Sequence, residues 1–182
     1  MAAARRLMSL GLFGVIFAFP AYTAAATRHL GAHVHGVTTL NIALDGQLLS
    51  IEGEMPGVNI VGFEHPPHTE AERARLTDSE ATLRNPAEWM KPNAEARCKI
   101  TTVEVKDDGF RADTHKGEHA DFDTRYLFTC DAPLNLRTIE LSLIQRFPGT
   151  HEVRVNAALP SGQAEEVFTT PIAAISFSPN VP

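Results

Sequence analysis

Hydrophobic and polar residues alternate along most of the chain after residue 30, and this alternation predicts a fold dominated by β-strands. In the first alternating stretch, the aliphatic residues Val34, Leu40 and Ile42 share one parity, whereas His33 and His35 share the other. Side chains of one parity leave the same side of a strand, so both imidazoles should project from one face. The stretch therefore predicts a strand with a pair of histidines opposite its aliphatic side.

A hairpin should follow this strand, because Asp45-Gly46 is a favoured two-residue turn between two alternating runs. With those two residues in the turn, Val37 pairs with Glu54, and Glu54 lies diagonal to His35 within reach of its ring. Two imidazoles with one or two carboxylates suit Zn²⁺ better than Mg²⁺ or Ca²⁺. A solvated polar face without a metal is the alternative interpretation of this patch.

The remaining pattern predicts an α+β fold, a mostly antiparallel β-sheet with one main helix, in a single domain with one disulfide. The helix should begin after Thr69, because Thr69 and Glu72 have the spacing of a capping box. It should run to Arg84 and stop before Pro86. Further strands are expected over residues 47–55, 98–106, 119–130, 136–143, 153–159, 165–170 and 172–177.

Residues 1–26 have the composition of a signal peptide. Arg5 and Arg6 precede an apolar run from Leu7 to Phe19, and small residues at 24–26 give a cleavage pattern. The mature chain should therefore begin at Thr27, and residues 27–182 should form one exported domain. No later segment of the sequence is long and apolar enough to cross a bilayer, so we expect no membrane insertion of the mature chain.

Charge and cysteine content narrow the class of protein. The formal net charge of −6 leaves no basic footprint for a nucleic acid. Cys98 and Cys130 are an even pair in an exported chain, which predicts a disulfide worth about 3–4 kcal/mol for a loop of about 30 residues. The two cysteines face each other if the strands that begin at 98 and end at 130 are antiparallel neighbours. A pair of zinc thiolates is the alternative, disfavoured by the oxidising compartment and by the lack of a C-x-x-C spacing.

The chain contains 8 histidines, several of them beside carboxylates. His119 repeats the pattern of the first strand, because it begins a predicted strand on the side opposite the aromatic residues, with Asp121 beside it. A polar residue at the end of a turn is its alternative role. Glu64 and His65 lie in a loop, where a hydrogen bond to the backbone is the alternative role. We expect His151 to be partly buried and structural, and His68 and His115 to be exposed to solvent.

These residues predict a metal site with His33, His35 and His119 as ligands. Its fourth ligand is left open among Glu54, Glu64, His65, Asp121 and water, all of which fit a tetrahedral Zn²⁺. The sequence lacks the G-x-S-x-G elbow, the phosphate-binding glycine loops and the H-E-x-x-H helix of common enzyme classes.

Taken together, several motifs resemble the ZrgA-type periplasmic zinc-binding proteins, a family formerly classed as a domain of unknown function. The motifs occur in the family's order over nearly the whole mature chain: Gly31-Ala32-His33-Val34-His35-Gly36, Asn59-Ile60-Val61-Gly62-Phe63-Glu64-His65, His119-Ala120-Asp121-Phe122, Tyr126-Leu127-Phe128-Thr129-Cys130 and Phe147-Pro148-Gly149. The resemblance implies a periplasmic zinc-binding protein of Gram-negative bacteria that acts in zinc uptake or trafficking. Family members often carry a long histidine-rich loop, whereas residues 110–120 hold only His115 and His119.

We therefore expect a zinc carrier or buffer that is not an enzyme, with a metal ion and a membrane zinc-uptake system as its partners. One alternative is a copper-binding carrier, because imidazole sites favour Cu²⁺ intrinsically. Against Cu⁺, the mature chain contains only Met55 and Met90. A second alternative is a zinc-dependent, hydrolase-like enzyme in which Glu54 or Glu64 acts as the base toward metal-bound water.

Overall fold

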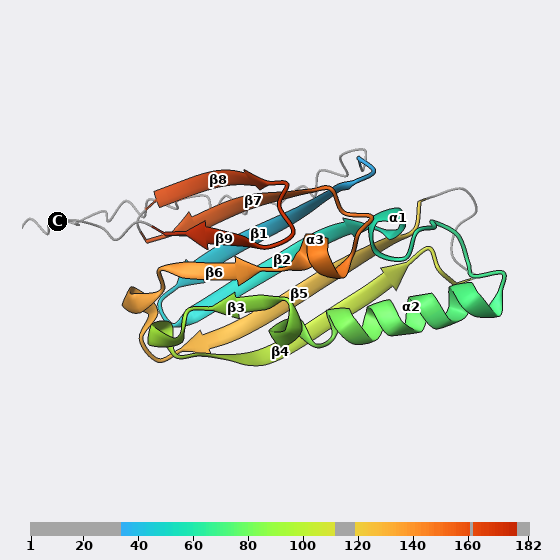
Figure 1. Cartoon of the computed structure of the whole chain (residues 1–182). Helices are drawn as coiled ribbons and strands as arrows, with labels where there is room; N and C mark the ends of the chain where they lie inside the picture. Colours follow the sequence, from blue (N-terminus) through green and yellow to red (C-terminus); the bar gives the residue numbers. More distant parts are fainter. Residues whose placement is uncertain (1–33, 112–118, 161, 178–182) are drawn as a thin grey trace, which may run out of the picture. The chain divides into compact units, whose positions relative to one another are not determined.

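Two β-sheets contribute to one hydrophobic core (Figure 1). The computed structural model describes residues 34–111, 119–160 and 162–177, which all lie in one unit spanning residues 32–182. The predicted signal peptide, residues 1–26, lies outside the described residues, as do His33 and His115.

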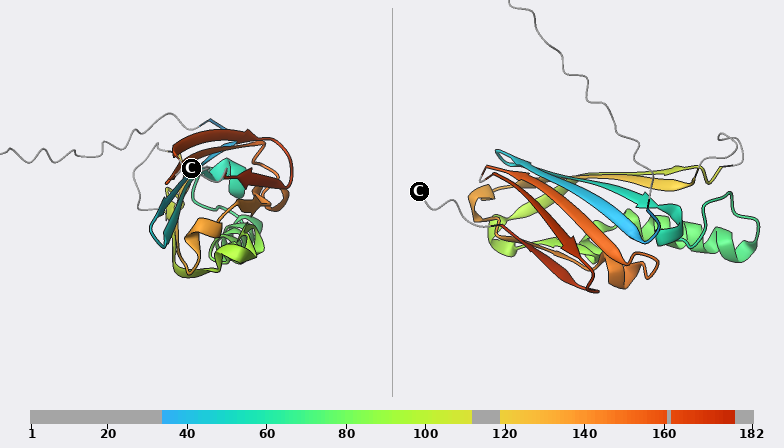
Figure 2. Two further views of the ribbon diagram at one scale, coloured as in Figure 1. Left: turned by 90° about the vertical axis from the view of Figure 1, so that its left-hand side faces the viewer. Right: turned by 90° about the horizontal axis from the view of Figure 1, so that it is seen from above.

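The larger sheet has six strands. Neighbouring strands are antiparallel except for β1 and β7, which run parallel. Their order across the sheet is β4 (Cys98–Asp108), β5 (Asp121–Cys130), β2 (Leu48–Pro56), β1 (Val37–Asp45), β7 (Glu152–Leu159) and β8 (Gly162–Phe168). Viewed end-on in the left panel of Figure 2, the strands of this sheet follow a curve with the helices on its inner side.

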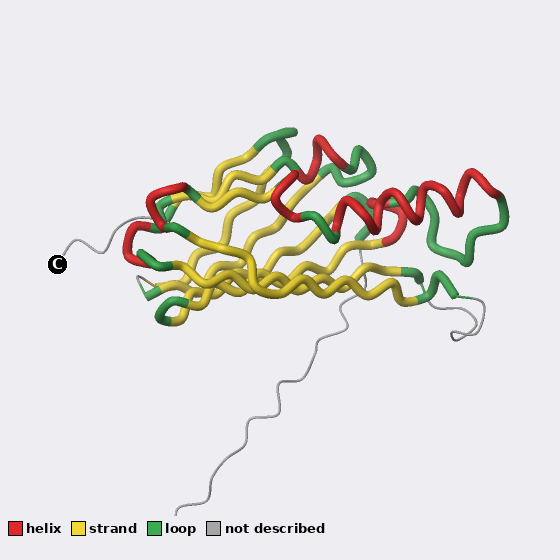
Figure 3. The backbone as a smooth tube through the Cα atoms, turned by 90° about the horizontal axis from the view of Figure 1, so that it is seen from below, coloured by secondary structure: helices red, strands yellow, loops and turns green. Residues whose placement is uncertain are grey.

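The smaller sheet and the main helix cover the same face of the larger sheet, as Figure 3 shows. The smaller sheet comprises β3 (Met90–Pro92), β6 (Thr138–Leu141) and β9 (Ala173–Ser176). The helices are α1 (Gly57–Ile60), α2 (Glu70–Leu83) and α3 (Leu143–Arg146), with single 3₁₀ turns at Pro86–Glu88, Ala94–Ala96 and Pro133–Asn135. These observations confirm the predicted sheet-rich fold with one main helix.

The core confirms the period-two pattern. Leu40 and Ile42 of β1 and Tyr126 of β5 are at most 2 % exposed, whereas Glu52 and Asn156 on the opposite face of the sheet are exposed. Burial of these aliphatic and aromatic side chains between the layers is the main stabilising contribution to such a fold.

Helix α2 begins where the sequence predicts and ends one residue before the predicted end, with Arg84 as its C-cap. The Thr69 side chain accepts from the Glu72 N–H, and the Glu72 carboxylate accepts from the Thr69 N–H, which completes the capping box. The helix ends at Leu83, ahead of Pro86, and buries only Ser79 and Leu83. It is therefore a surface helix with one narrow buried stripe.

The predicted register of the first hairpin is wrong by two residues. The turn consists of Gly46 and Gln47, with Gly46 at φ +56°, and Asp45 pairs with Leu48. A positive φ costs glycine little and costs aspartate more, so the glycine occupies the first turn position. Glu54 consequently pairs with Thr39 instead of Val37. A shift of two preserves the faces of the strands but moves Glu54 away from His35.

The first strand also starts later than predicted. Strand β1 begins at Val37, and His35 and Gly36 form a turn before it, with Gly36 at φ +84°. Val34, expected on the buried aliphatic side, is 56 % exposed. The left-handed glycine interrupts the strand, so the parity rule does not extend back to His35.

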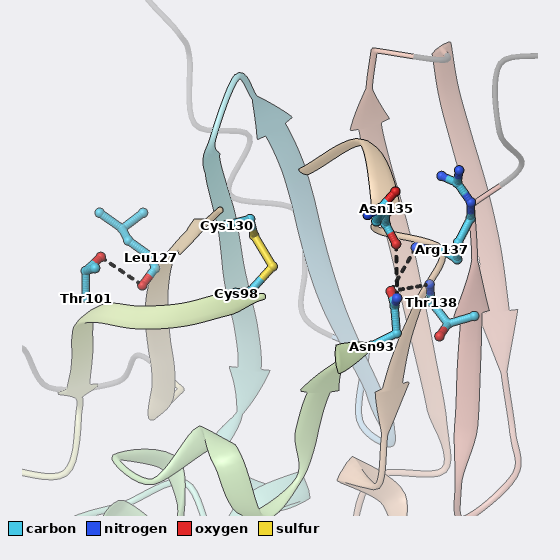
Figure 4. Close-up of a disulfide and its surroundings, with 8 residues drawn as sticks. All are labelled: Asn93, Cys98, Thr101, Leu127, Cys130, Asn135, Arg137 and Thr138. Carbon is cyan, nitrogen blue, oxygen red and sulfur yellow. Dashed lines mark hydrogen bonds between the residues drawn. A yellow bond between two sulfur atoms is a disulfide. The ribbon is translucent and has the colours of Figure 1, made fainter. Parts of the chain in front are cut away.

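The disulfide forms as predicted, between Cys98 and Cys130, which pair directly across β4 and β5 (Figure 4). It closes the end of the sheet where β5 finishes. Beside it, the Asn93 side chain accepts from the N–H groups of Arg137 and Thr138 and joins the smaller sheet to this end. Among the described residues, no helix has the length and apolar character needed to cross a membrane.

Candidate metal centre

Strand direction brings three distant segments together at one end of the larger sheet. Strands β1 and β5 both run antiparallel to β2, so both begin at the end where β2 finishes. His35 lies just before β1 and His119 just before β5, while the chain leaving β2 passes through α1 to Glu64. The pairing of β2 with both β1 and β5 thus places the two histidines at the same end of the sheet, and the segment through α1 brings the carboxylate there.

Glu64 bridges the two histidines. Its Oε2 atom lies 3.2 Å from His35 Nε2 and 2.5 Å from His119 Nδ1, and each ring nitrogen donates to it. The ring centroids of His35 and His119 are 5.9 Å apart at an interplanar angle of 76°. One ligand atom from each of the three residues lies within 4.8 Å of the other two, a spacing suited to a shared metal ion.

The carboxylate forms the base of this cluster and the imidazoles form its rim. The Glu64 side chain is 12 % exposed, whereas the side chains of His35 and His119 are 60 % and 69 % exposed. The second oxygen of Glu64, Oε1, is buried and has no hydrogen-bond partner among the residues that the structure describes. A buried anionic oxygen without a donor fits a cation at this place, since such an atom otherwise carries an uncompensated desolvation cost.

Charge couples the three groups. Burial raises the pKa of the Glu64 carboxyl, but hydrogen bonds from His119 and His35 outweigh this and hold that pKa below its ordinary value. The hydrogen bond to Glu64 and its negative charge raise the pKa of His119, and Asp121 adds to this increase. The cluster therefore favours an ionised carboxylate and a protonated His119, whose positive charge stands where a cation would bind.

Asn59 fixes the turn that carries His35. Its side chain is 1 % exposed, its Oδ1 accepts from the Gly36 N–H at 2.7 Å, and its Nδ2 donates to the Val37 carbonyl at 2.9 Å. The same Nδ2 donates to the Thr38 hydroxyl, which contacts the hydroxyl of Thr150. Asn59 is thus a positioning residue, because buried hydrogen bonds of this kind hold a backbone segment in one geometry.

Close packing ties the other segments to α1. The Gly57 N–H donates to the Ala120 carbonyl at 2.7 Å, directly after His119. A Cβ at Gly57 would lie 2.4 Å from that carbonyl oxygen, and one at Gly149 would lie 2.6 Å from the Asn59 carbonyl oxygen. Only glycine permits these approaches. The motifs that contain Gly36, Asn59, Ala120 and Gly149 therefore pack around one another at the histidine end of the sheet.

The loop that carries Glu64 is anchored on both sides. Arg75 of α2 donates to the Val61 carbonyl, and Ser79 donates to the Ile60 carbonyl. Phe63 is buried and packs edge-on against Phe110. The carboxylate of Glu64 consequently stands on a packed support rather than on a loose loop.

Only some of the predicted ligands meet in the part of the chain that the structure describes. It brings together His35, His119 and Glu64, while His33 lies outside the described residues. Glu54 is exposed and does not belong to the cluster, because of the hairpin register described above. Asp121 acts on the cluster through its charge.

Of two further histidines, His65 takes the alternative role that the sequence left open, and His151 differs from expectation. His65 turns away from the cluster and forms a second group with His68 and Glu72. Its Nδ1 also bonds the Pro66 carbonyl, the backbone role left open by the sequence. His151 is exposed rather than partly buried, and its ring lies over Gly36, next to His35. It precedes β7, so the parity of that strand does not govern it.

Sequence reasoning missed Asn59 and the second histidine group. Nothing in the local pattern distinguishes a buried asparagine on a four-residue helix from an exposed one. The group around His65 had a signal, since the ligands stand at spacings of three and four residues around a capping box.

The sequence was compared with protein-family models and with curated proteins. No curated protein matches the chain. The sequence model of the ZrgA family of zinc uptake proteins matches residues 32–177, which include His35, Glu64 and His119. The chain belongs to the ZrgA family of zinc uptake proteins.

Proposed function

We propose that this protein is a periplasmic zinc carrier that binds Zn²⁺ at His35, Glu64 and His119 and serves zinc uptake by trafficking or buffering the ion. The observation that carries the proposal is the Glu64 carboxylate. Its Oε2 accepts hydrogen bonds from two imidazoles on distant segments, and its buried Oε1 has no hydrogen-bond partner among the described residues. Membership of the zinc uptake family supports the identity of the ion.

The ligand set suits zinc. Two imidazole nitrogens and one carboxylate oxygen are common zinc ligands, and a fourth position completes a tetrahedron. We assign this position to His33, two residues before His35 in the sequence, or to water. Binding requires the ring nitrogens to release the protons that they share with Glu64, so zinc competes with protons here.

Exposure of the rim favours a carrier over an enzyme. His35 and His119 are more than half exposed, so a bound ion would be accessible to an acceptor protein. A zinc-dependent hydrolase would need a substrate pocket beside the metal. A hollow of about 600 Å³ lies on the face of the larger sheet away from the core, lined partly by Asn41, Ser50 and Asn156, and contains no residue of the cluster.

The copper alternative receives less support. Met55 and Met90 are 0 % and 1 % exposed within the core, so their sulfur atoms are not accessible as Cu⁺ ligands. Cu²⁺ remains a competitor at any imidazole site, and a titration should therefore include it.

Metal titration of single variants tests the site. His35→Ala, His119→Ala and Glu64→Gln should each weaken zinc binding at least tenfold, about 1.4 kcal/mol at 25 °C, in isothermal titration calorimetry. His151→Ala is the matched control, because its exposed ring lies beside Gly36 but outside the cluster. Unchanged zinc affinity in all three variants would overturn the proposed site.

The location is tested separately. The predicted cleavage after residue 26 places the mature N-terminus at Thr27, which mass spectrometry of a periplasmic fraction can measure. A full-length chain retained in the membrane would contradict a periplasmic carrier. A membrane zinc-uptake system is the proposed recipient of the ion.

A further inference from the structure

A second group of ligands stands at the start of α2. One ligand atom from each of His65, His68 and Glu72 lies within 4.8 Å of the other two. Glu64 of the first cluster and His65 of this group are consecutive residues, yet their side chains take part in different clusters. The zinc site proposed above does not include this second group.

The ring of His65 is held in one orientation. Its Nδ1 donates to the Pro66 carbonyl at 2.9 Å, which leaves the lone pair of Nε2 free to face a metal. The ring stacks on Phe63 with centroids 5.1 Å apart, and Phe63 itself is buried in the core. The first ligand is therefore preorganised, and little conformational entropy would be lost when a cation binds.

His68 adds a second imidazole parallel to the first. The two rings stack with centroids 4.6 Å apart at an interplanar angle of 11°. His68 is exposed, so its ring can adjust to a bound ion and the ion can reach it from solvent. The prolines between the two histidines restrict the backbone that sets their spacing.

Glu72 supplies the negative charge. Its Oε2 accepts from the N–H groups of His68 and Thr69 at 2.7 and 3.0 Å, and the capping box uses this oxygen alone. Oε1 can therefore turn toward a cation without loss of the cap. The positive end of the helix dipole opposes a cation, and the carboxylate of Glu72 offsets it.

We infer that His65, His68 and Glu72 form a second site for a divalent first-row transition-metal ion, separate from the cluster of His35, Glu64 and His119. Two imidazoles and a carboxylate select such an ion over Mg²⁺ or Ca²⁺. The site binds more weakly than the first, because it stands at the N-terminus of α2, where the positive end of the helix dipole opposes a cation.

The test removes the first cluster and titrates Zn²⁺ into what remains. The double variant His35→Ala/His119→Ala should bind one zinc ion in isothermal titration calorimetry. Adding His68→Ala or Glu72→Gln to it should weaken this binding at least tenfold, about one unit in log Kd. Glutamine can keep the capping bonds, so Glu72→Gln tests charge rather than folding. Glu70→Gln is the matched control, because Glu70 lies in the same turn and pairs with Arg73 instead.

The outcomes separate this site from the proposed carrier site. No zinc binding in the double variant, or binding that survives both His68→Ala and Glu72→Gln, would overturn the second site. If the first cluster does not bind zinc, the wild-type protein and the double variant will titrate alike, and His68→Ala will still weaken the binding at least tenfold. Zinc-induced shifts of the ring ¹⁵N resonances of His65 and His68 give an independent readout.

Discussion

Asn59 and Gly36 are joined by a buried hydrogen bond, from the Gly36 N–H to Asn59 Oδ1 at 2.7 Å. Asn59 belongs to the short helix after β2, whereas Gly36 follows the rim histidine His35. This contact holds the turn before β1 against α1. The geometry of the cluster of His35, Glu64 and His119 therefore depends on a residue outside that cluster.

Replacement of Asn59 by alanine should affect both stability and metal binding. The Gly36 N–H and the Val37 carbonyl would lose their partners, at a cost of about 1–3 kcal/mol in the free energy of unfolding for each buried group left unpaired. Release of the turn should also weaken zinc binding about tenfold, since His35 would no longer be held near Glu64. Denaturant unfolding and calorimetric titration measure the two effects.

Asn93→Ala is the matched control for that variant. Asn93 also bonds two backbone N–H groups, but at the disulfide end of the sheet (Figure 4). It should lower stability by a smaller amount, because its bonds are less buried, and leave zinc affinity unchanged. Equal loss of zinc affinity in both variants would show that the effect of Asn59 is general destabilisation rather than positioning.

Removal of the disulfide should separate stability from function. Cys98→Ser/Cys130→Ser should lower the free energy of unfolding by about 3–4 kcal/mol, because the closed loop no longer restricts the unfolded chain. Zinc affinity should stay within a factor of about two, since the bond lies at the opposite end of β5 from His119. Thiol labelling of the wild-type protein without reductant should be negligible, and two reactive thiols would contradict the bond.

Stability without metal should depend on pH through the pair of Glu64 and His119. The raised pKa of His119 means that its contact stabilises the fold fully below pH 6.5, and this contribution is lost as the pH rises through that raised pKa. The lowered pKa of Glu64 gives the opposite sign, with a contribution present above pH 4.5 and lost as the pH falls through the lowered pKa. The pair therefore contributes most between pH 4.5 and 6.5.

Two measurements check this dependence. NMR titration of the ring of His119 should give a pKa above 6.5 in the wild-type protein and a lower pKa in Glu64→Gln. Zinc affinity should fall as the pH falls through the raised pKa of His119, because protons compete with zinc for the ring nitrogen. The stabilising contact between His119 and Glu64, in contrast, is gained over the same pH decrease. An unchanged pKa of His119 in Glu64→Gln would contradict the coupling.

Gly57→Ala should be strongly destabilising for a steric reason. A Cβ at this position would lie 2.4 Å from the Ala120 carbonyl oxygen, so α1 and the start of β5 must separate, at a cost of about 1–3 kcal/mol or more. Gly46→Ala provides the comparison, because its Cβ would meet nothing within 4 Å and only its φ of +56° opposes the change. Gly57→Ala should also weaken zinc binding, whereas Gly46→Ala should not. Thermal unfolding and calorimetric titration of both variants test this difference.

The sequence alone determined the features that depend on near neighbours. The parity of apolar residues identified the buried side of Leu40 and Ile42, and the spacing of Thr69 and Glu72 identified the start of α2. These signals are local, because side-chain direction in a strand and the capping of a helix depend on only a few consecutive residues. The pairing of Cys98 with Cys130 followed from the even number of cysteines in a chain expected to be exported, and the two residues do face each other across β4 and β5.

Only the tertiary structure decided which of the candidate ligands meet. His35 and His119 reach Glu64 across 29 and 55 residues of sequence, and their meeting depends on the strand order β5-β2-β1. Strand order depends on the packing of all the layers together, which no local pattern contains. The same holds for Glu54, where a change of one position in a turn shifted the register and removed the carboxylate from the site.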